Sequence, residues 1–136
     1  MVPTPMKHLA IFDQKTIQKI FNGEKTIDAR FSKHRIAPFG VIASRDTVLI
    51  KLSGGDVVGE FEVQSVITFD NLTPEKIQKI KRDYNRNIKM DPLFWHEKEQ
   101  AKYGTLLFIE NVQPVLIPLA IKKRDMRPWV VLNQAT

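Results

Sequence analysis

Hydrophobic and polar residues alternate along several short stretches of this chain. In residues 26–31, Ile27, Ala29 and Phe31 alternate with Asp28 and Arg30. Successive side chains of a strand point to opposite sides, so this pattern predicts a strand with one face towards a core. Similar patterns predict strands at 7–12, 46–52, 57–63, 105–109, 112–117 and 129–132.

Three other stretches have the residue spacing of helices. Asp13, Thr73 and Asp91 each precede one of them, and their side-chain oxygens can accept hydrogen bonds from the first turn. Proline follows Thr73 and Asp91, at the position where a helix tolerates it best. We expect the helices to cover about 13–22, to start at 74, and to extend from 92 to about 102.

The order of these elements indicates the fold class. The strands are short, turns separate them at regular intervals, and the helices are inserted between them. Ser53-Gly54-Gly55-Asp56 predicts a tight hairpin turn, Glu110-Asn111 joins two later strands, and a break in the pattern at 65–67 indicates a bulge or an edge. The sequence therefore predicts an α+β fold, a small mixed β-barrel of about six strands with about three flanking helices.

The composition excludes several classes of function. With 136 residues and a hydrophobic fraction of 43%, the chain can form one globular domain. We expect this domain at 7–132, between a flexible lead at 1–6 and a short tail at 133–136. The absence of cysteine excludes disulfides, thiol catalysis and zinc–thiolate sites. No grouping of His, Asp or Glu predicts another metal site, and no motif predicts a cofactor.

The chain has no sequence signal for a membrane. No apolar run approaches the roughly 18 residues that a spanning helix needs. The first residues lack the basic and then apolar pattern of a signal peptide. We therefore predict a cytoplasmic protein that does not bind a membrane.

The charge of the chain favours anionic partners. The formal net charge is +6, which attracts polyanions through steering and counterion release. One face of the helix that starts at 74 is basic; it carries Lys76, Lys79, Lys81, Arg82 and Arg86. Such a face can be solvated, can contact an RNA backbone, or can bind an acidic protein partner, and the sequence leaves these three interpretations open.

Charge, turn chemistry and strand alternation coincide at residues 23–30. Gly23 follows the first predicted helix, where a glycine can take the left-handed conformation that ends it. Lys25 stands just before the strand, and Asp28 and Arg30 lie on its polar face. These three residues can form a small charged pocket; alternatively, Asp28 and Arg30 pair on a solvated face and Lys25 is a surface lysine.

The spacing Gly-x-Lys-x-x-Asp-x-Arg at 23–30 resembles the signature of the ASCH domain, a branch of the PUA-like superfamily. Further similar segments are Pro38-Phe39, Lys51-Leu52-Ser53-Gly54-Gly55, Lys102-Tyr103-Gly104-Thr105-Leu106 and Trp129-Val130-Val131-Leu132. The resemblance covers about 7–132. It implies a PUA-like barrel with flanking helices and a cleft beside the signature, suited to RNA or to a nucleoside or nucleotide ligand.

The resemblance also implies a set of ligand-binding residues. Its members are Lys25, Asp28, Arg30, Lys51, Ser53, Tyr103 and Trp129. Aromatic rings can stack on any base. Tyr103 can stack in this way or pack with its hydroxyl bonded, whereas the Val-Val-Leu after Trp129 favours packing for that residue.

An enzyme is the alternative to a binding module. Some ASCH relatives are ribonucleases, and one branch hydrolyses the amide of acetylcytidine with a lysine, a threonine and a glutamate. This chain has Lys25 at the lysine position but Asp28 at the threonine position, and it lacks a matching glutamate. A hydrolase would use Lys25 as base or nucleophile and Asp28 to orient it. Ribonuclease chemistry would need a second group, for which His34 and Tyr103 are the candidates.

Overall fold

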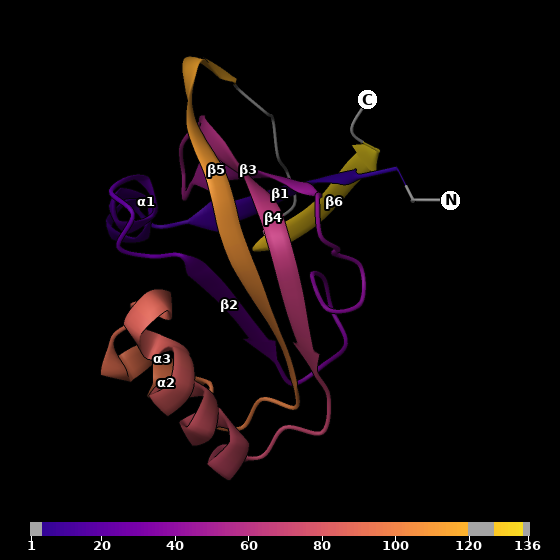
Figure 1. Cartoon of the computed structure of the whole chain (residues 1–136), viewed down its shortest axis with the longest axis vertical. Coiled ribbons are helices and arrows are strands. Elements are labelled where there is room, and N and C mark those ends of the chain that lie inside the picture. Colours follow the sequence, from indigo (N-terminus) through magenta and orange to yellow (C-terminus); the bar gives the residue numbers. More distant parts are fainter. Residues whose placement is uncertain (1–3, 120–126, 135–136) are drawn as a thin grey trace.

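The computed structural model describes residues 4–119 and 127–134, which form a curved six-stranded sheet and three helices (Figure 1). In chain order the elements are β1 (Met6–Phe12), α1 (Gln14–Phe21), β2 (Ile27–Ser32), β3 (Thr47–Leu52), β4 (Val57–Phe69), α2 (Pro74–Ile88), α3 (Pro92–Glu97), β5 (Tyr103–Leu119) and β6 (Trp129–Gln134). Of the predicted lead and tail, residues 1–3 and 135–136 lie outside the described residues.

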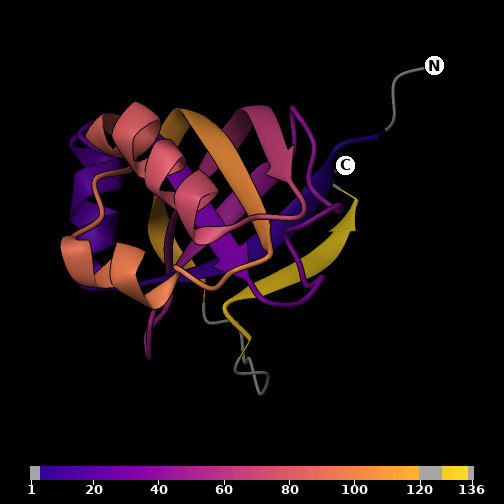
Figure 2. The same ribbon diagram turned by 90° about the horizontal axis from the view of Figure 1, so that it is seen from below.

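The strands follow the order β2-β5-β4-β3-β1-β6. All neighbours are antiparallel except β1 and β3, which are parallel, so the sheet is mixed. Figure 2 shows the sheet curving into a half-barrel, with α2 and α3 packed outside one wall. The predicted α+β class with a small PUA-like barrel is confirmed. In the described part of the chain, no helix is both long and apolar enough to cross a membrane.

The helix caps form as the sequence predicts. Asp13 accepts a hydrogen bond from the backbone N of Thr16 at 2.7 Å, and Thr73 and Asp91 accept from the third residue of their helices in the same way. The end predicted for the third helix is wrong, because α3 ends at Glu97 and not near residue 102. The backbone of Lys102 already donates to Ser32 in β2, so the chain has turned towards the sheet by that point.

The prediction that Glu110-Asn111 joins two separate strands is also wrong, because both predicted strands belong to β5. Asn111 takes a left-handed conformation, with φ of 51°, inside this strand. The register between β4 and β5 shifts at this position, and the Asn111 amide donates to Glu62 across it. The residue therefore forms a bulge that bends a continuous strand. The break predicted at 65–67 corresponds to a further register shift between Val63 and Ser65, and β4 continues to Phe69.

Two hydrophobic clusters lie on opposite sides of β2. Ile27, Ala29 and Phe31 pack against α2 and α3, together with Leu106 of β5 and other residues. This confirms the predicted core-facing set. The other face of β2 points into the half-barrel, where a second cluster includes Phe12 and Trp129. The polar residues of β2 therefore face the interior of the half-barrel and not bulk water.

Candidate functional site

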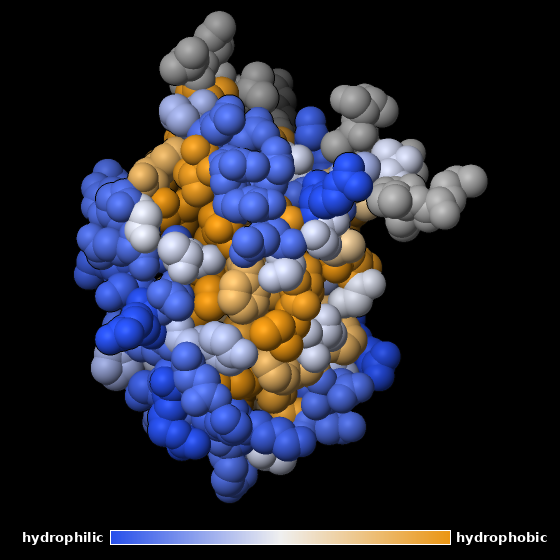
Figure 3. All heavy atoms as spheres, viewed as in Figure 1, coloured by the Kyte–Doolittle hydropathy of each residue, from blue (hydrophilic) through white to orange (hydrophobic). Residues whose placement is uncertain are grey.

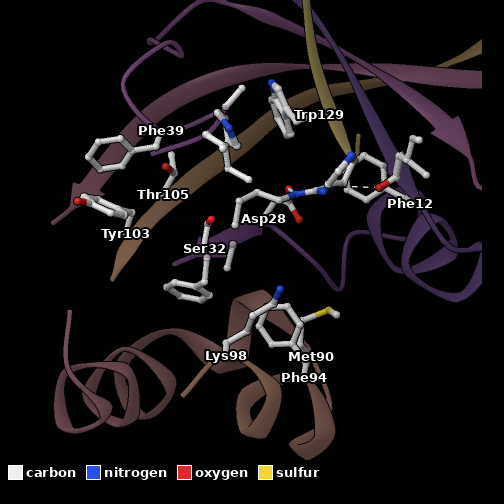
Figure 4. A pocket seen from close by; sticks show the side chains of 18 of the residues that line it. Phe12, Asp28, Ser32, Phe39, Met90, Phe94, Lys98, Tyr103, Thr105 and Trp129 are labelled. Atoms are coloured by element: carbon white, nitrogen blue, oxygen red, sulfur yellow. Dashed lines mark hydrogen bonds and ion pairs between the residues drawn. The ribbon is translucent and has the colours of Figure 1, made fainter. Parts of the chain in front are cut away.

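The polar face of β2 continues onto its neighbour β5. Arg30 pairs with Thr105, and Ser32 pairs with Tyr103, in the antiparallel register of these strands. Directly opposed residues place their side chains on the same face of a sheet. A cavity of about 240 Å³ lies over this face, and all four side chains line it (Figure 4).

Arg30 is held in place by contacts with four residues. Its Nε donates to Oδ2 of Asp28 at 2.8 Å, and its Nη2 donates to the backbone oxygen of Ile11 at 3.4 Å. The guanidinium carbon lies 4.8 Å from the ring centre of Phe12 and 5.1 Å from that of Trp129, which are cation–π distances. Its Nη1 donates to none of the described residues. Arg30 is thus a fixed cation at the wall of the cavity with donor capacity left over.

Asp28 and Lys25 meet behind this arginine. Asp28 is only 4% exposed, and its Oδ1 lies 3.7 Å from Nζ of Lys25. Lys25 is 1% exposed and donates to the backbone oxygen of Ile88 at 2.7 Å, at the C-terminal end of α2. Burial lowers the pKa of Lys25 from 10.5 to about 8, although the charge of Asp28 opposes the shift. The alternative of a loose surface lysine is therefore wrong.

Lys25 does not itself line the cavity, although Asp28 and Arg30 do. Its ammonium group lies at the end of α2, where the last carbonyls of the helix lack partners within it. The lysine therefore joins α2 to the carboxylate that positions Arg30. In this geometry the residue supports the site from behind.

Trp129 is packed and also borders the cavity. It is 2% exposed, and its Nε1 donates to Nδ1 of His8 at 3.1 Å. His8 is fully buried, and its Nε2 lies 2.8 Å from Oδ2 of Asp46. An indole N–H can only donate, so Nδ1 of His8 accepts and Nε2 carries the proton towards Asp46. These contacts fix the ring that lies against Arg30.

Aromatic residues also line the cavity on the side away from Trp129. Tyr103 and Phe39 meet edge to face, with ring centres 5.0 Å apart, and both line the cavity (Figure 4). The guanidinium carbon of Arg35 lies 5.3 Å from the ring centre of Tyr103 and 5.6 Å from that of Phe39. Phe94 and Lys98 lie across from them in Figure 4, near Met90. A flat ligand would therefore meet aromatic surface on several sides.

Thr105 has an unsatisfied hydroxyl at the cavity. The residue is 1% exposed, and its Oγ1 has no hydrogen-bond partner among the described residues. A buried hydroxyl without a partner is unfavourable, and a ligand that bonded it would relieve this cost. Sequence reasoning missed Thr105 as a site residue, as it missed Phe12, Phe39 and Phe94. The pairing of Thr105 with Arg30 depends on a contact between distant strands, for which the local pattern contains no signal.

Lys51 and Ser53 lie outside this cavity. Nζ of Lys51 donates to the backbone oxygen of Leu52 at 3.3 Å. Ser53 is exposed, and its backbone N donates to the oxygen of Phe12 at 2.9 Å, which ties the turn to the end of β1. Of the seven predicted ligand-binding residues, Asp28, Arg30, Tyr103 and Trp129 line the cavity. Among residues 4–119 and 127–134, no three His, Asp or Glu side chains are grouped to hold a metal ion.

Comparison with solved structures places this geometry among known folds. The crystal structure of ASCH from Zymomonas mobilis superposes with a TM-score of 0.70 and 14% identity, over 94% of this chain and 88% of that one. The chain has the fold of an ASCH domain. Two point mutants of the Zymomonas protein give TM-scores of 0.72 and 0.70, again at 14% identity. They cover 97% and 94% of this chain, and 92% and 91% of the mutant chains.

The ASCH likeness rests on structure. No protein-family model matches the sequence, and no curated protein sequence matches it. At 14% identity the superposition shows a shared fold and carries no residue assignments. The resemblance implied by the spacing at 23–30 is thus confirmed as an ASCH fold.

Proposed function

We propose that this protein binds RNA, or a nucleoside or nucleotide ligand, with one base inserted into the cavity over β2 and β5. The observation that carries the proposal is the position of Arg30. Its guanidinium is fixed by Asp28 and by the rings of Phe12 and Trp129, and it borders a cavity lined by further aromatic residues. Aromatic walls with a few oriented polar groups are typical of sites for planar ligands.

The size of the cavity favours a small occupant. Its volume of about 240 Å³ is slightly below the range of about 300–1,000 Å³ for small-molecule sites. A single base therefore fits this cavity better than a dinucleotide cofactor would. The polar groups suit the edge of a base: Arg30 would donate to a ring or carbonyl acceptor, and Asp28 would accept from an exocyclic amine, as carboxylates do with cytosine. The hydroxyl of Thr105 could donate or accept a hydrogen bond at the edge of the base.

A binding experiment with a conservative variant tests this function. Arg30→Lys keeps the charge but loses the planar guanidinium that lies at cation–π distance from two rings. We expect nucleosides, nucleotides and short RNAs to raise the melting temperature of the wild type, and Arg30→Lys to lose most of that rise. Arg45→Lys makes the same exchange at an exposed arginine and serves as the control. Equal shifts in all three proteins would contradict the proposal.

A hydrolase is the second candidate, and one observation favours it. The lowered pKa of Lys25, about 8, is a feature of lysines that act as bases or nucleophiles. However, Lys25 is 1% exposed, bonded to Ile88, and does not line the cavity. A reacting group has to reach its substrate, so binding is the function that this geometry supports best. Turnover of labelled RNA or of acetylcytidine that disappears in Lys25→Ala would favour the hydrolase instead.

A further inference from the structure

A second concavity lies at the C-terminal end of α2. Its volume is about 470 Å³, and five basic residues line it against one acidic residue, Asp91. The basic residues are Lys19, Lys81, Arg82, Arg86 and Lys89. We call this concavity the basic groove. Figure 3 shows hydrophilic residues gathered over the end of the molecule formed by α2 and α3, whereas the front of the strands is largely hydrophobic.

Four of the five cations of the basic groove are available to a ligand. Lys81, Arg82, Arg86 and Lys89 form no side-chain ion pair or hydrogen bond with any described residue. Elsewhere on the same helix, Lys79 is paired with Asp83 at 2.6 Å. The one acidic residue, Asp91, is engaged in capping α3 through the backbone N of Phe94. The groove therefore has an excess of unpaired positive charge.

The C-terminal end of α2 does not repel an anion as a helix C-terminus with unpaired carbonyl groups would. Such an end carries partial negative charge on its last carbonyl groups. Here the oxygen of Asn87 accepts from the backbone of Thr26, that of Ile88 from Lys25, and that of Lys89 from the side chain of Lys19. Two of these three donors are cations. The local field at the groove is consequently set by its basic side chains.

The basic groove adjoins the cavity. Met90 lines both of them. On α1 and its cap, Asp13 and Thr16 line the cavity and Lys19 lines the groove. Residues three apart lie on one side of a helix, so this side of α1 extends from one concavity to the other. The cavity and the groove are therefore neighbours along α1 and at Met90.

We propose that the basic groove binds the phosphates of a single-stranded nucleic acid whose base occupies the cavity. This inference rests on the function proposed for the cavity, and it makes an oligonucleotide the preferred ligand over a free nucleoside. Proteins that bind single strands combine a cationic groove that follows the backbone with aromatic surfaces that stack bases. The two concavities supply these two elements side by side. An acidic protein would match the charge of the groove but would have no use for the adjoining aromatic cavity.

A charge-matched pair of double variants tests the groove. Arg82→Ala with Arg86→Ala removes two cations from it, and Lys76→Ala with Lys79→Ala removes two cations from the same helix outside it. All four residues are exposed, so both proteins should fold. The probe is a fluorescein-labelled single-stranded RNA of about ten nucleotides, within the usual site sizes for single-strand binders. Its affinity is measured by fluorescence anisotropy at several salt concentrations.

We expect the groove variant to bind the RNA about ten-fold more weakly at low salt. The slope of log affinity against log salt should fall by about 1.4, because each phosphate contact on a single strand contributes about 0.7. The control variant should stay within about two-fold of the wild type. Equal weakening in both variants, or in neither, would overturn the inference, as would polyglutamate that competes as well as RNA does.

A second measurement separates this inference from the function of the cavity. Free nucleosides touch only the cavity, so the groove variant should keep the thermal shift that nucleosides give to the wild type. If nucleosides bind and the RNA binds no better than they do, the groove proposal fails and the cavity proposal stands. If Arg30→Lys leaves the binding of nucleosides and RNA unchanged while the groove variant loses RNA, the cavity proposal fails and the groove binds RNA by itself.

Discussion

The indole N–H of Trp129 donates to Nδ1 of His8 over 3.1 Å inside the half-barrel. His8 in turn bonds Asp46, whose carboxylate also accepts from the backbone N of Met6 and of Ala43. The other side of the indole ring faces Arg30. One buried histidine therefore connects β1, the start of β3 and β6 to the wall of the cavity, and its neutral form is the one that satisfies both partners.

Replacing His8 should weaken both the fold and the site. His8→Ala leaves the indole N–H and one lone pair of Asp46 without partners, and each buried group left unpaired costs about 1–3 kcal/mol. We expect a loss of about 2–6 kcal/mol in the free energy of unfolding, measured by urea denaturation. His34→Ala, at an exposed histidine, should change it by less than about 0.5 kcal/mol. A stable His8→Ala protein would show that Trp129 does not depend on this hydrogen bond.

Thr105→Val separates stability from binding. Valine has nearly the same shape as threonine, and the hydroxyl that it removes makes no hydrogen bond to a described residue. The free protein should therefore keep or slightly gain stability, because no protein hydrogen bond is lost. If the hydroxyl contacts the ligand, nucleoside binding should weaken by about 1 kcal/mol, or roughly five-fold. Titration calorimetry measures the affinity, and urea denaturation measures the stability.

The control for this prediction is Thr68→Val. Thr68 pairs with Thr105 across β4 and β5 but is exposed and does not line the cavity. Its substitution should leave nucleoside affinity unchanged. A loss of affinity in both variants would point to a general effect of valine on these strands, and a loss in neither would exclude Thr105 from the ligand contacts.

The parts of the fold that depend on residues close together in the sequence could be predicted from the sequence. Asp13, Thr73 and Asp91 cap helices because a side chain can reach its own first turn. Asp28 and Arg30 meet because residues two apart share a strand face. The local pattern was misleading where tertiary contacts decide the structure. It predicted that Glu110-Asn111 connects two separate strands, but pairing with β4 makes this position a bulge within one strand.

The rest of the site depends on contacts between distant segments. The burial of Lys25 requires the end of α2, 63 residues away along the chain. Thr105 becomes a site residue only because β5 pairs with β2, and Phe12 only because β1 passes Arg30. No local periodicity records such contacts. Lys51 and Ser53 were predicted as ligand-binding residues from the family resemblance alone, and the structure places them outside the cavity.

Gly104→Ala should disturb the site through packing. A methyl group at this position would come within 2.7 and 2.8 Å of two ring atoms of Phe31. Phe31 is buried against α3, so its ring has little room to move. Overpacking of this kind costs about 1–3 kcal/mol. We expect a lower midpoint in urea and, because Gly104 lies between Tyr103 and Thr105, weaker nucleoside binding. An unchanged midpoint would mean that the core around Phe31 adapts freely.

Lys25 should make stability depend on pH in the alkaline range. Its pKa is about 8 in the folded protein and 10.5 when unperturbed, mainly because burial disfavours the ammonium form. Below pH 8 both states hold the proton, and the folded state bears the full penalty. Between pH 8 and about 10.5 the unfolded state binds more protons, so the free energy of unfolding rises with pH, by about 3 kcal/mol in total.

Lys25→Met removes the titrating amine, so the variant should lack this rise in the free energy of unfolding at alkaline pH. Urea denaturation of both proteins from about pH 7 to about pH 10.5 measures the difference in unfolding free energy, in which the titrations of all other groups largely cancel. We expect the wild type to gain relative to the variant as the pH rises above the lowered pKa of Lys25, and Lys15→Met, at an exposed lysine, to follow the wild type. Parallel curves for the wild type and Lys25→Met would mean that Lys25 titrates near its ordinary pKa. A lysine with a lowered pKa should, in contrast, release its proton in mildly alkaline solution and leave Asp28 paired with Arg30 alone.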